Sequence, residues 1–201
     1  MKLNHFILIA SSLSIFTIIS ACQSFQQKKS LSAEEQMDLI SKGKMITQLS
    51  FQALSGELLK ALQEGGVQNA VGYCHLQASP IIDSLSQVFD ADINRVSDKY
   101  RNPQNKPDKT DIIVLDAYRQ QIADGRELQP HLEVTGDLII YYAPILIQNP
   151  TCLLCHGEPG ATIEQENYNY ILSRYPEDLA TGYSLGDLRG VWKVALTKET
   201  K

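Results

Sequence analysis

Apolar positions recur every three to four residues along the first third of the chain, which is the spacing of a helix. Ser32 followed by Glu35 forms the pattern of a capping box, and periodic Leu and Ile residues over 39–62 predict one long helix. The pair Gly65-Gly66 is expected to end it. We predict a second helix over residues 67–78, and a third over residues 81–89 that begins at Pro80.

The rest of the chain alternates between strand and helix patterns. Predicted strands cover 92–97, 128–134, 138–147 and 191–196, predicted helices cover 111–123 and 163–173, and loops cover 101–107 and 151–160. Thr135-Gly136-Asp137 between two of the strands indicates a hairpin. Helices followed by an antiparallel sheet predict a single α+β domain over residues 32–201.

The first 22 residues have the pattern of an export signal. Lys2 precedes an apolar stretch over residues 6–19, which is short for a membrane span but typical of a signal peptide. Ile19-Ser20-Ala21-Cys22 resembles a bacterial lipobox. We therefore expect a signal peptide over 1–21, lipidation of Cys22, a polar tether over 22–31, and a periplasmic lipoprotein held at the membrane by its lipid. An ordinary signal peptide, with Cys22 incidental, is the alternative.

Charge and cysteine content exclude several classes of protein. The 201 residues include 18 Lys and Arg against 23 Asp and Glu, for a net charge of −5, so nucleic-acid binding is not expected. Four cysteines are far too few for a disulfide scaffold. Each cysteine therefore needs a separate explanation.

Cys152-Leu153-Leu154-Cys155-His156 matches the attachment motif of c-type haem. Two thiols three positions apart can each add to one vinyl group of the porphyrin, and the adjoining His156 supplies an axial imidazole. A single motif predicts one covalent haem c. A Cys152–Cys155 disulfide, a thioredoxin-like redox motif and a zinc site are the alternatives, but none of them explains the motif as completely.

Five side chains are candidates for the second axial position on the iron. They are Cys74, His75, His131, Met37 and Met45. Cys74 shares a helix face with Ala70 and Ala78, which leave an apolar recess, whereas His75 points about 100° away. Cys74 and His75 therefore cannot bind one iron together or act as a catalytic dyad. From the residues alone, Cys74 as a small buried apolar side chain remains equally open.

Several stretches of the chain together resemble a known bacterial family. They are Ala70-Val71-Gly72-Tyr73-Cys74, residues 95–103 with Asn105 and Pro107, Tyr142-Ala143-Pro144-Ile145, Cys152-Leu153-Leu154-Cys155-His156-Gly157, and residues 175–183. The chain resembles the exported single-haem c-type proteins with a PAS-like sensor fold. The resemblance implies N-terminal helices packed on an antiparallel PAS-like sheet, with His156 and Cys74 as the axial ligands. His75 is the rival candidate for the second axial ligand. Arg95 and Arg101 either neutralise the haem propionates, or they are solvated or stabilise the turn.

The expected function is that of a sensor and not of an enzyme. Thiolate opposite imidazole stabilises the ferric state, and reduction is expected to release Cys74 and open a position for a diatomic ligand such as CO or NO. Such a sensor needs a periplasmic signalling or redox partner. The alternative is a single-haem electron carrier; a peroxidase lacks a distal His and Arg pair.

Overall fold

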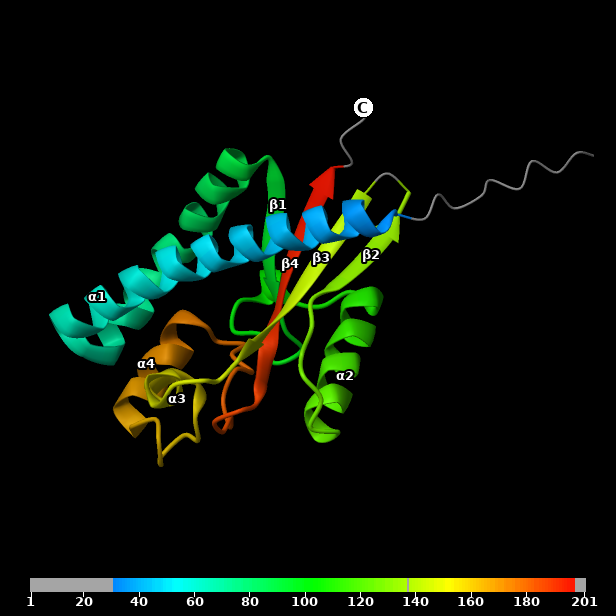
Figure 1. Ribbon diagram of the computed structural model, residues 1–201. Coiled ribbons are helices and arrows are strands. Elements are labelled where there is room, and N and C mark those ends of the chain that lie inside the picture. Colours follow the sequence, from blue (N-terminus) through cyan, green and yellow to red (C-terminus); the bar gives the residue numbers. More distant parts are fainter. Residues whose placement is uncertain (1–30, 137, 198–201) are drawn as a thin grey trace, which may run out of the picture.

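The protein was analysed as a computed structural model that describes residues 31–136 and 138–197 (Figure 1). The predicted signal peptide over 1–21, the predicted lipidation site Cys22 and the tether up to residue 30 lie outside the described residues. None of the helices in the described part of the chain is long and apolar enough to cross a membrane.

The described strands form one antiparallel sheet in the order β1-β4-β3-β2. Their bounds are Ala91–Val96 for β1, His131–Thr135 for β2, Leu138–Leu146 for β3 and Leu188–Thr197 for β4. β2 and β3 form the predicted hairpin. Because helices pack on both faces of this sheet, the predicted α+β class is confirmed (Figure 1).

Helix α1, Ala33–Phe89, folds back on itself at a pair of glycines. Its start is the predicted capping box, since Glu35 N donates to Ser32 Oγ at 3.2 Å and Ser32 N donates to Glu35 Oε2 at 2.8 Å. Gly65 and Gly66 leave helical geometry, and Gly66 has φ 70°, a conformation that favours glycine. The chain therefore reverses at this turn, and the two halves of α1 diverge from it at an angle (Figure 1).

The predicted helix break at Pro80 is wrong. Pro80 lies inside the second half of α1, and no residue near it leaves helical geometry. Proline removes one hydrogen bond from a helix interior and costs about 3 kcal/mol. Ile82, Leu85 and Phe89, which follow it, pack against the core of the sheet and offset that cost.

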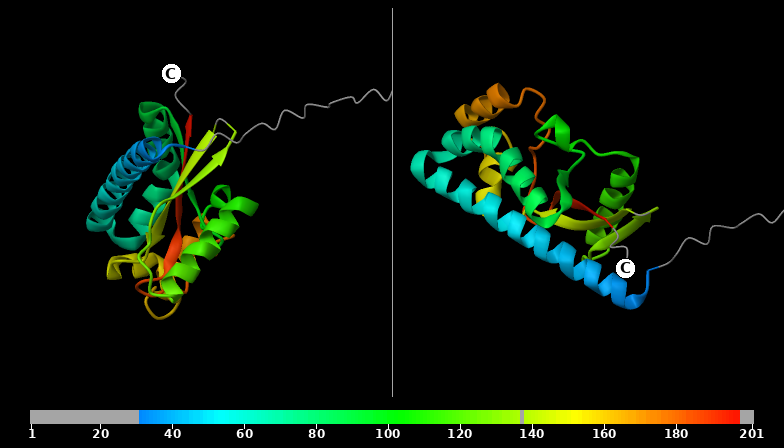
Figure 2. Two further views of the ribbon diagram at one scale, coloured as in Figure 1. Left: turned by 45° about the vertical axis from the view of Figure 1, so that its right-hand side comes forward. Right: turned by 90° about the horizontal axis from the view of Figure 1, so that it is seen from above.

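The two faces of the sheet carry different helices, as the left view of Figure 2 shows. On one face, α1 packs Ile46 and Ile82 against Tyr141 and Trp192. On the other face lies α2, Lys109–Ala123, whose Tyr118 is almost fully buried. The sheet is therefore covered on both faces, and the domain has three packed layers, with α1 and α2 on opposite sides of the sheet.

Two short helices close one end of the domain. α3 is Pro150–His156, α4 is Gln165–Arg174, and the 3-10 turn η1 is Pro103–Asn105. The predicted loop over 151–160 is thus helical in its first part, because Asn149 caps the helix and Pro150 occupies its first turn. Ile163 and Ile171 pack against Val71 in the second half of α1.

The contact of Gly43 with the sheet gives a test of this packing. A Cβ at Gly43 would lie 2.4 Å from the ring of Tyr141, which is 1% exposed, whereas a Cβ at Gly56 meets nothing within 4 Å. We expect Gly43→Ala to lower the free energy of unfolding by about 1–3 kcal/mol. Gly56→Ala, the matched control in the same helix, should raise it by up to about 1 kcal/mol. Denaturant titration measures both; equal stabilities would contradict the packing.

Candidate functional site

A cavity of about 320 Å³ lies between both halves of α1, helix α3 and the sheet. Cys74 and His75 of α1 and Cys152, Cys155 and His156 of α3 all line it. Cys74 and the cysteine motif are far apart in sequence. The fold therefore brings the two sets of residues singled out in the sequence to one place.

The other candidate ligands lie elsewhere. Met37 and Met45 are 64% and 48% exposed on the first half of α1, and neither lines the cavity. His131 is exposed on β2, where its Nε2 lies 3.5 Å from a carboxylate oxygen of Glu133. The structure does not bring these three side chains to the cavity.

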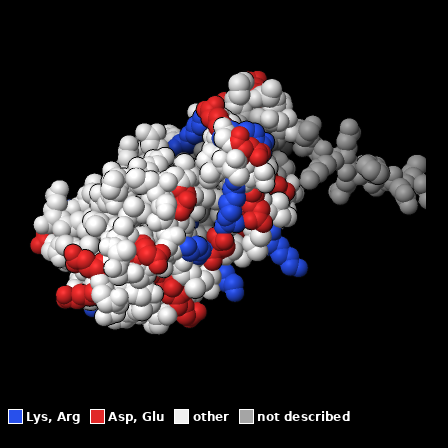
Figure 3. Space-filling view, turned by 90° about the horizontal axis from the view of Figure 1, so that it is seen from below, with Lys and Arg blue, Asp and Glu red and all other residues white. Residues whose placement is uncertain are grey.

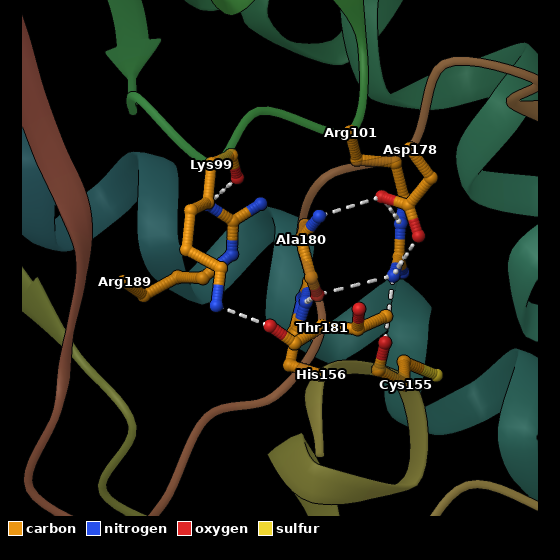
Figure 4. Close-up of polar contacts among 8 residues, drawn as sticks. All are labelled: Lys99, Arg101, Cys155, His156, Asp178, Ala180, Thr181 and Arg189. Carbon is orange, nitrogen blue, oxygen red and sulfur yellow. Dashed lines mark hydrogen bonds and ion pairs between the residues drawn. The ribbon is translucent and has the colours of Figure 1, made fainter. Parts of the chain in front are cut away.

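Arg101 ties three separate segments together beside the cavity (Figure 4). Its guanidinium donates to both carboxylate oxygens of Asp178, at 3.1 and 3.0 Å, and to the carbonyl of Cys155 at 2.6 Å. The Asp178 carboxylate is fully buried and the Arg101 side chain is 14% exposed. This bidentate pair holds the loop after β1, the end of α3 and the segment before Ala180 in fixed positions.

His156 is held as a neutral imidazole. Its Nδ1 lies 2.8 Å from the carbonyl oxygen of Ala180. Because a carbonyl can only accept, Nδ1 carries the proton and Nε2 keeps its lone pair. Burial, and next the positive charges of Arg189 and Arg101, hold the pKa of His156 well below its usual value. A histidine in this state is ready to bind a metal through Nε2.

Main-chain hydrogen bonds fix the end of α3 to the segment that follows Asp178. Tyr183 N donates to the His156 carbonyl at 3.0 Å, and Gly182 N donates to the Gly157 carbonyl at 2.8 Å. Lys99 also donates to the Thr181 carbonyl (Figure 4). The orientation of His156 therefore depends on contacts to residues 180–183.

The cysteines of the cavity are thiols. Cys152 and Cys155 lie one turn apart on α3, and no cysteine in residues 31–136 and 138–197 forms a disulfide. Burial raises the pKa of Cys74 and of Cys155, which keeps both side chains protonated at neutral pH. The described residues also contain no cluster of three or more His, Cys, Asp or Glu side chains suited to a metal ion. The disulfide and zinc alternatives thus gain no support.

The walls of the cavity differ in chemistry. α1 contributes an apolar wall, with Leu54, Leu58, Leu62, Val71 and Ala78. The sheet and its loops contribute a polar and basic wall, with Arg95, Arg101, Arg189, Asn102 and Asn105. The cavity is therefore suited to a molecule with a large apolar body and an acidic edge.

Cys74 and His75 diverge as the helical spacing predicts. Cys74 is partly buried at the cavity, whereas His75 is exposed and makes an edge contact with Tyr175 at 5.0 Å between ring centroids. Both residues touch the cavity, but only Cys74 does so from the apolar recess beside Ala70 and Ala78. This favours Cys74 as the residue that faces a bound group.

Sequence reasoning did not find two of the residues that shape this site. Arg189 lies at the start of β4 and carries no motif, and Asp178 gave no sign of its pairing with Arg101. Arg101 itself was open between two roles, and the structure pairs it with Asp178. Only the proximity of opposite charges in the fold reveals these contacts.

Comparisons with known proteins give a family for the chain. The family model Tll0287-like (Tll0287) matches residues 10–197. A solved structure, titled "Crystal structure of the cyanobacterial heme-protein Tll0287", aligns with a TM-score of 0.57 and 21% identity over 85% of this chain and 99% of that chain. At this identity the alignment shows a common fold. No curated protein matches the chain. Since the family model covers nearly all of the sequence, this chain belongs to the Tll0287-like family.

Proposed function

We propose that the chain binds one covalent haem c in this cavity and acts as a redox or diatomic-gas sensor. The observation that carries the proposal is the pairing, in one cavity, of a neutral His156 with free Nε2 and the thiol of Cys74. The two thiols of Cys152 and Cys155 directly precede His156 in the attachment motif. The solved relative, described as a heme-protein, gives independent support.

The residues of the cavity fit a haem. Its volume of about 320 Å³ lies in the range of small-molecule sites. The apolar wall from α1 suits the flat macrocycle, and the arginines suit its two carboxylates. No Asp or Glu side chain among the described residues lines the cavity, and Asp178, which lies beside it, is paired with Arg101.

Each residue has a separate role in this proposal. Cys152 and Cys155 form the two thioether links, His156 is the proximal ligand, and Cys74 is the distal ligand. The Ala180 carbonyl fixes the tautomer of His156, and Arg101 fixes Ala180 through Asp178. When bound, haem would supply one-electron chemistry. If one ligand left the iron, haem could also bind a small diatomic molecule such as CO or NO.

Cys74 is the residue that would switch. Burial favours the neutral thiol of Cys74 and raises its pKa, and the positive charges of Arg95 and Arg101 oppose this effect only in part. Release of Cys74 would remove one constraint on the second half of α1, which continues from the first half through the non-helical Gly65 and Gly66. That half packs against the sheet through Ile82 and leads directly into β1. A change at Cys74 would thereby reach the sheet.

The rest of the proposal follows from the sequence. The export signal and Cys22 support a periplasmic lipoprotein that signals through a redox or signalling partner and is not itself an enzyme. Covalent attachment of haem c requires export, so the two predictions support each other. A single-haem electron carrier is the alternative, and the ligand experiment below separates the two.

Covalent attachment is the first test. Purified from cells that mature c-type cytochromes, the protein should carry the added mass of one haem that survives denaturation. Replacing both thiols, Cys152→Ala with Cys155→Ala, should abolish covalent haem, while Cys74→Ala should retain it. Mass spectrometry of the denatured chains measures this. A polypeptide mass without haem in the unsubstituted protein would refute the proposed function.

The distal ligand is the second test. Cys74→Ala should abolish a low-spin thiolate signature in the EPR spectrum of the ferric protein, and His75→Ala, its neighbour on the same helix, should leave it unchanged. Addition of CO to the reduced protein should change the absorption spectrum. A reduced protein that does not respond to CO would favour the electron carrier. Loss of the signature in His75→Ala instead would transfer the role to His75.

The third test concerns the support of His156. Arg101→Ala leaves the carboxylate of Asp178 buried without its partner, so we expect the free energy of unfolding to fall by about 3–5 kcal/mol. Arg119→Ala, which removes an arginine 41% exposed and paired with Asp98 and Asp116, should cost less than about 1 kcal/mol. Denaturant unfolding compares them. Similar losses would show that the Arg101 pair does not hold the site.

A further inference from the structure

Three arginines reach the cavity, and they share one carboxylate. Arg95 comes from β1, Arg101 from the following loop and Arg189 from β4. Asp178 gives both of its oxygens to Arg101. Among the described residues, neither Arg95 nor Arg189 forms an ion pair with a carboxylate.

Of Arg95 and Arg189, Arg95 is the one without any polar partner in the described part of the chain. Within the described residues it forms no hydrogen bond and no ion pair, although it is only partly exposed and lines the cavity. The nearby groups that act on its charge are Cys74 and Tyr175, neither of which is charged at neutral pH. Burial lowers the pKa of Arg95. Its charge thus faces the cavity uncompensated.

Arg189 has polar contacts but no anion. Its Nη1 donates to the Lys99 carbonyl at 3.1 Å, and its guanidinium lies 5.6 Å from the centre of the Tyr183 ring. Burial, and the charges of Arg101 and Arg95, lower the pKa of Arg189. The positive charges of Arg95 and Arg101 thus disfavour the charged form of Arg189, and an added anion would relieve this repulsion.

The charge of the cavity is not part of a basic surface. In the view of Figure 3, the charged side chains on the side of α3 and α4 are mainly acidic, and basic side chains gather on the side of α2. The exposed residues around α4 include Glu158, Glu164, Glu166 and Glu177. The two free guanidiniums are consequently an internal feature, set beside an apolar wall and screened from an acidic exterior.

A buried charge without a partner costs several kcal/mol, so a protein that keeps two of them gains from a ligand that neutralises both. We propose that Arg95 and Arg189 form a two-carboxylate site that binds the two propionates of haem, and that Arg101 takes no part in it. This inference rests on the proposed function and assigns the orientation of the group: its acidic edge lies against β1 and β4. The sequence suggested Arg95 and Arg101 as the residues that neutralise the propionates. In this inference Arg189 takes the place of Arg101.

Binding of two ligands that differ only in their carboxylates tests the site. The full mature chain with Cys152→Ala and Cys155→Ala is titrated with haemin and with haemin dimethyl ester. A charge-assisted hydrogen bond contributes about 1.5–3 kcal/mol, so haemin should bind at least about tenfold more tightly than the ester for each arginine engaged. Arg95→Gln and Arg189→Gln should each reduce this preference at least about tenfold. Arg126→Gln, an exposed arginine paired with Asp124, should not change it.

A second measurement uses the covalent haem protein and does not depend on the substituted chain folding without haem. Loss of a positive charge next to the propionates should lower the midpoint potential in Arg95→Gln and Arg189→Gln and shift the carboxylate bands in the infrared difference spectrum between the two redox states. Arg95→Lys, which keeps the charge, should restore the potential in part. Arg126→Gln should behave as the unsubstituted protein.

The outcomes distinguish a failure of the two-arginine site from a failure of the proposed haem-binding function. An equal preference for haemin over its ester in Arg95→Gln, Arg189→Gln and Arg126→Gln would overturn the two-arginine site, as would unchanged carboxylate bands in the first two. Haem would still be attached in that case, and the proposed function would stand. Absence of covalent haem from the unsubstituted protein would instead remove the function itself.

Discussion

The buried pair of Arg101 and Asp178 is the contact on which the geometry of the site depends. It connects the loop after β1 to the segment that precedes Ala180, and the same guanidinium binds the carbonyl of Cys155. The charge of each buried group is compensated by the other, so breaking the pair would be costly and the pair holds these segments together. In this arrangement Nδ1 of His156 lies at hydrogen-bond distance from the Ala180 carbonyl, and Nε2 stays free.

The contrast between the two walls of the cavity has a simple origin. α1 is long enough to fold back at Gly65-Gly66 and offer an apolar surface from both halves. The sheet offers strand ends, where side chains leave the packed core and arginines are tolerated. A space between such surfaces suits a mostly apolar molecule that carries negative charge at one edge.

Local patterns in the sequence predict much of this structure. Ser32 and Glu35, the glycine pair and the antiparallel strands are confirmed because short-range hydrogen bonding and periodicity determine them. Pro80 was misjudged because packing of the residues after it outweighs its local cost, and the helix α3 was missed because it is short and begins from the cap Asn149. The cysteine motif was found from its spacing and Cys74 was favoured by the family resemblance, whereas Arg189 and Asp178 have contacts that only the folded chain creates.

The brevity of α3 has a consequence for how the protein matures. A helix of 7 residues is not stable by itself in water and forms only when neighbouring segments pack on it. Before the chain has folded, the segment that carries Cys152 and Cys155 is therefore not held in a helix, and both sulfur atoms are accessible. Once residues 180–183 have docked on the end of α3, that access narrows. If haem is attached to these cysteines as proposed, the shortness of α3 favours attachment before folding is complete.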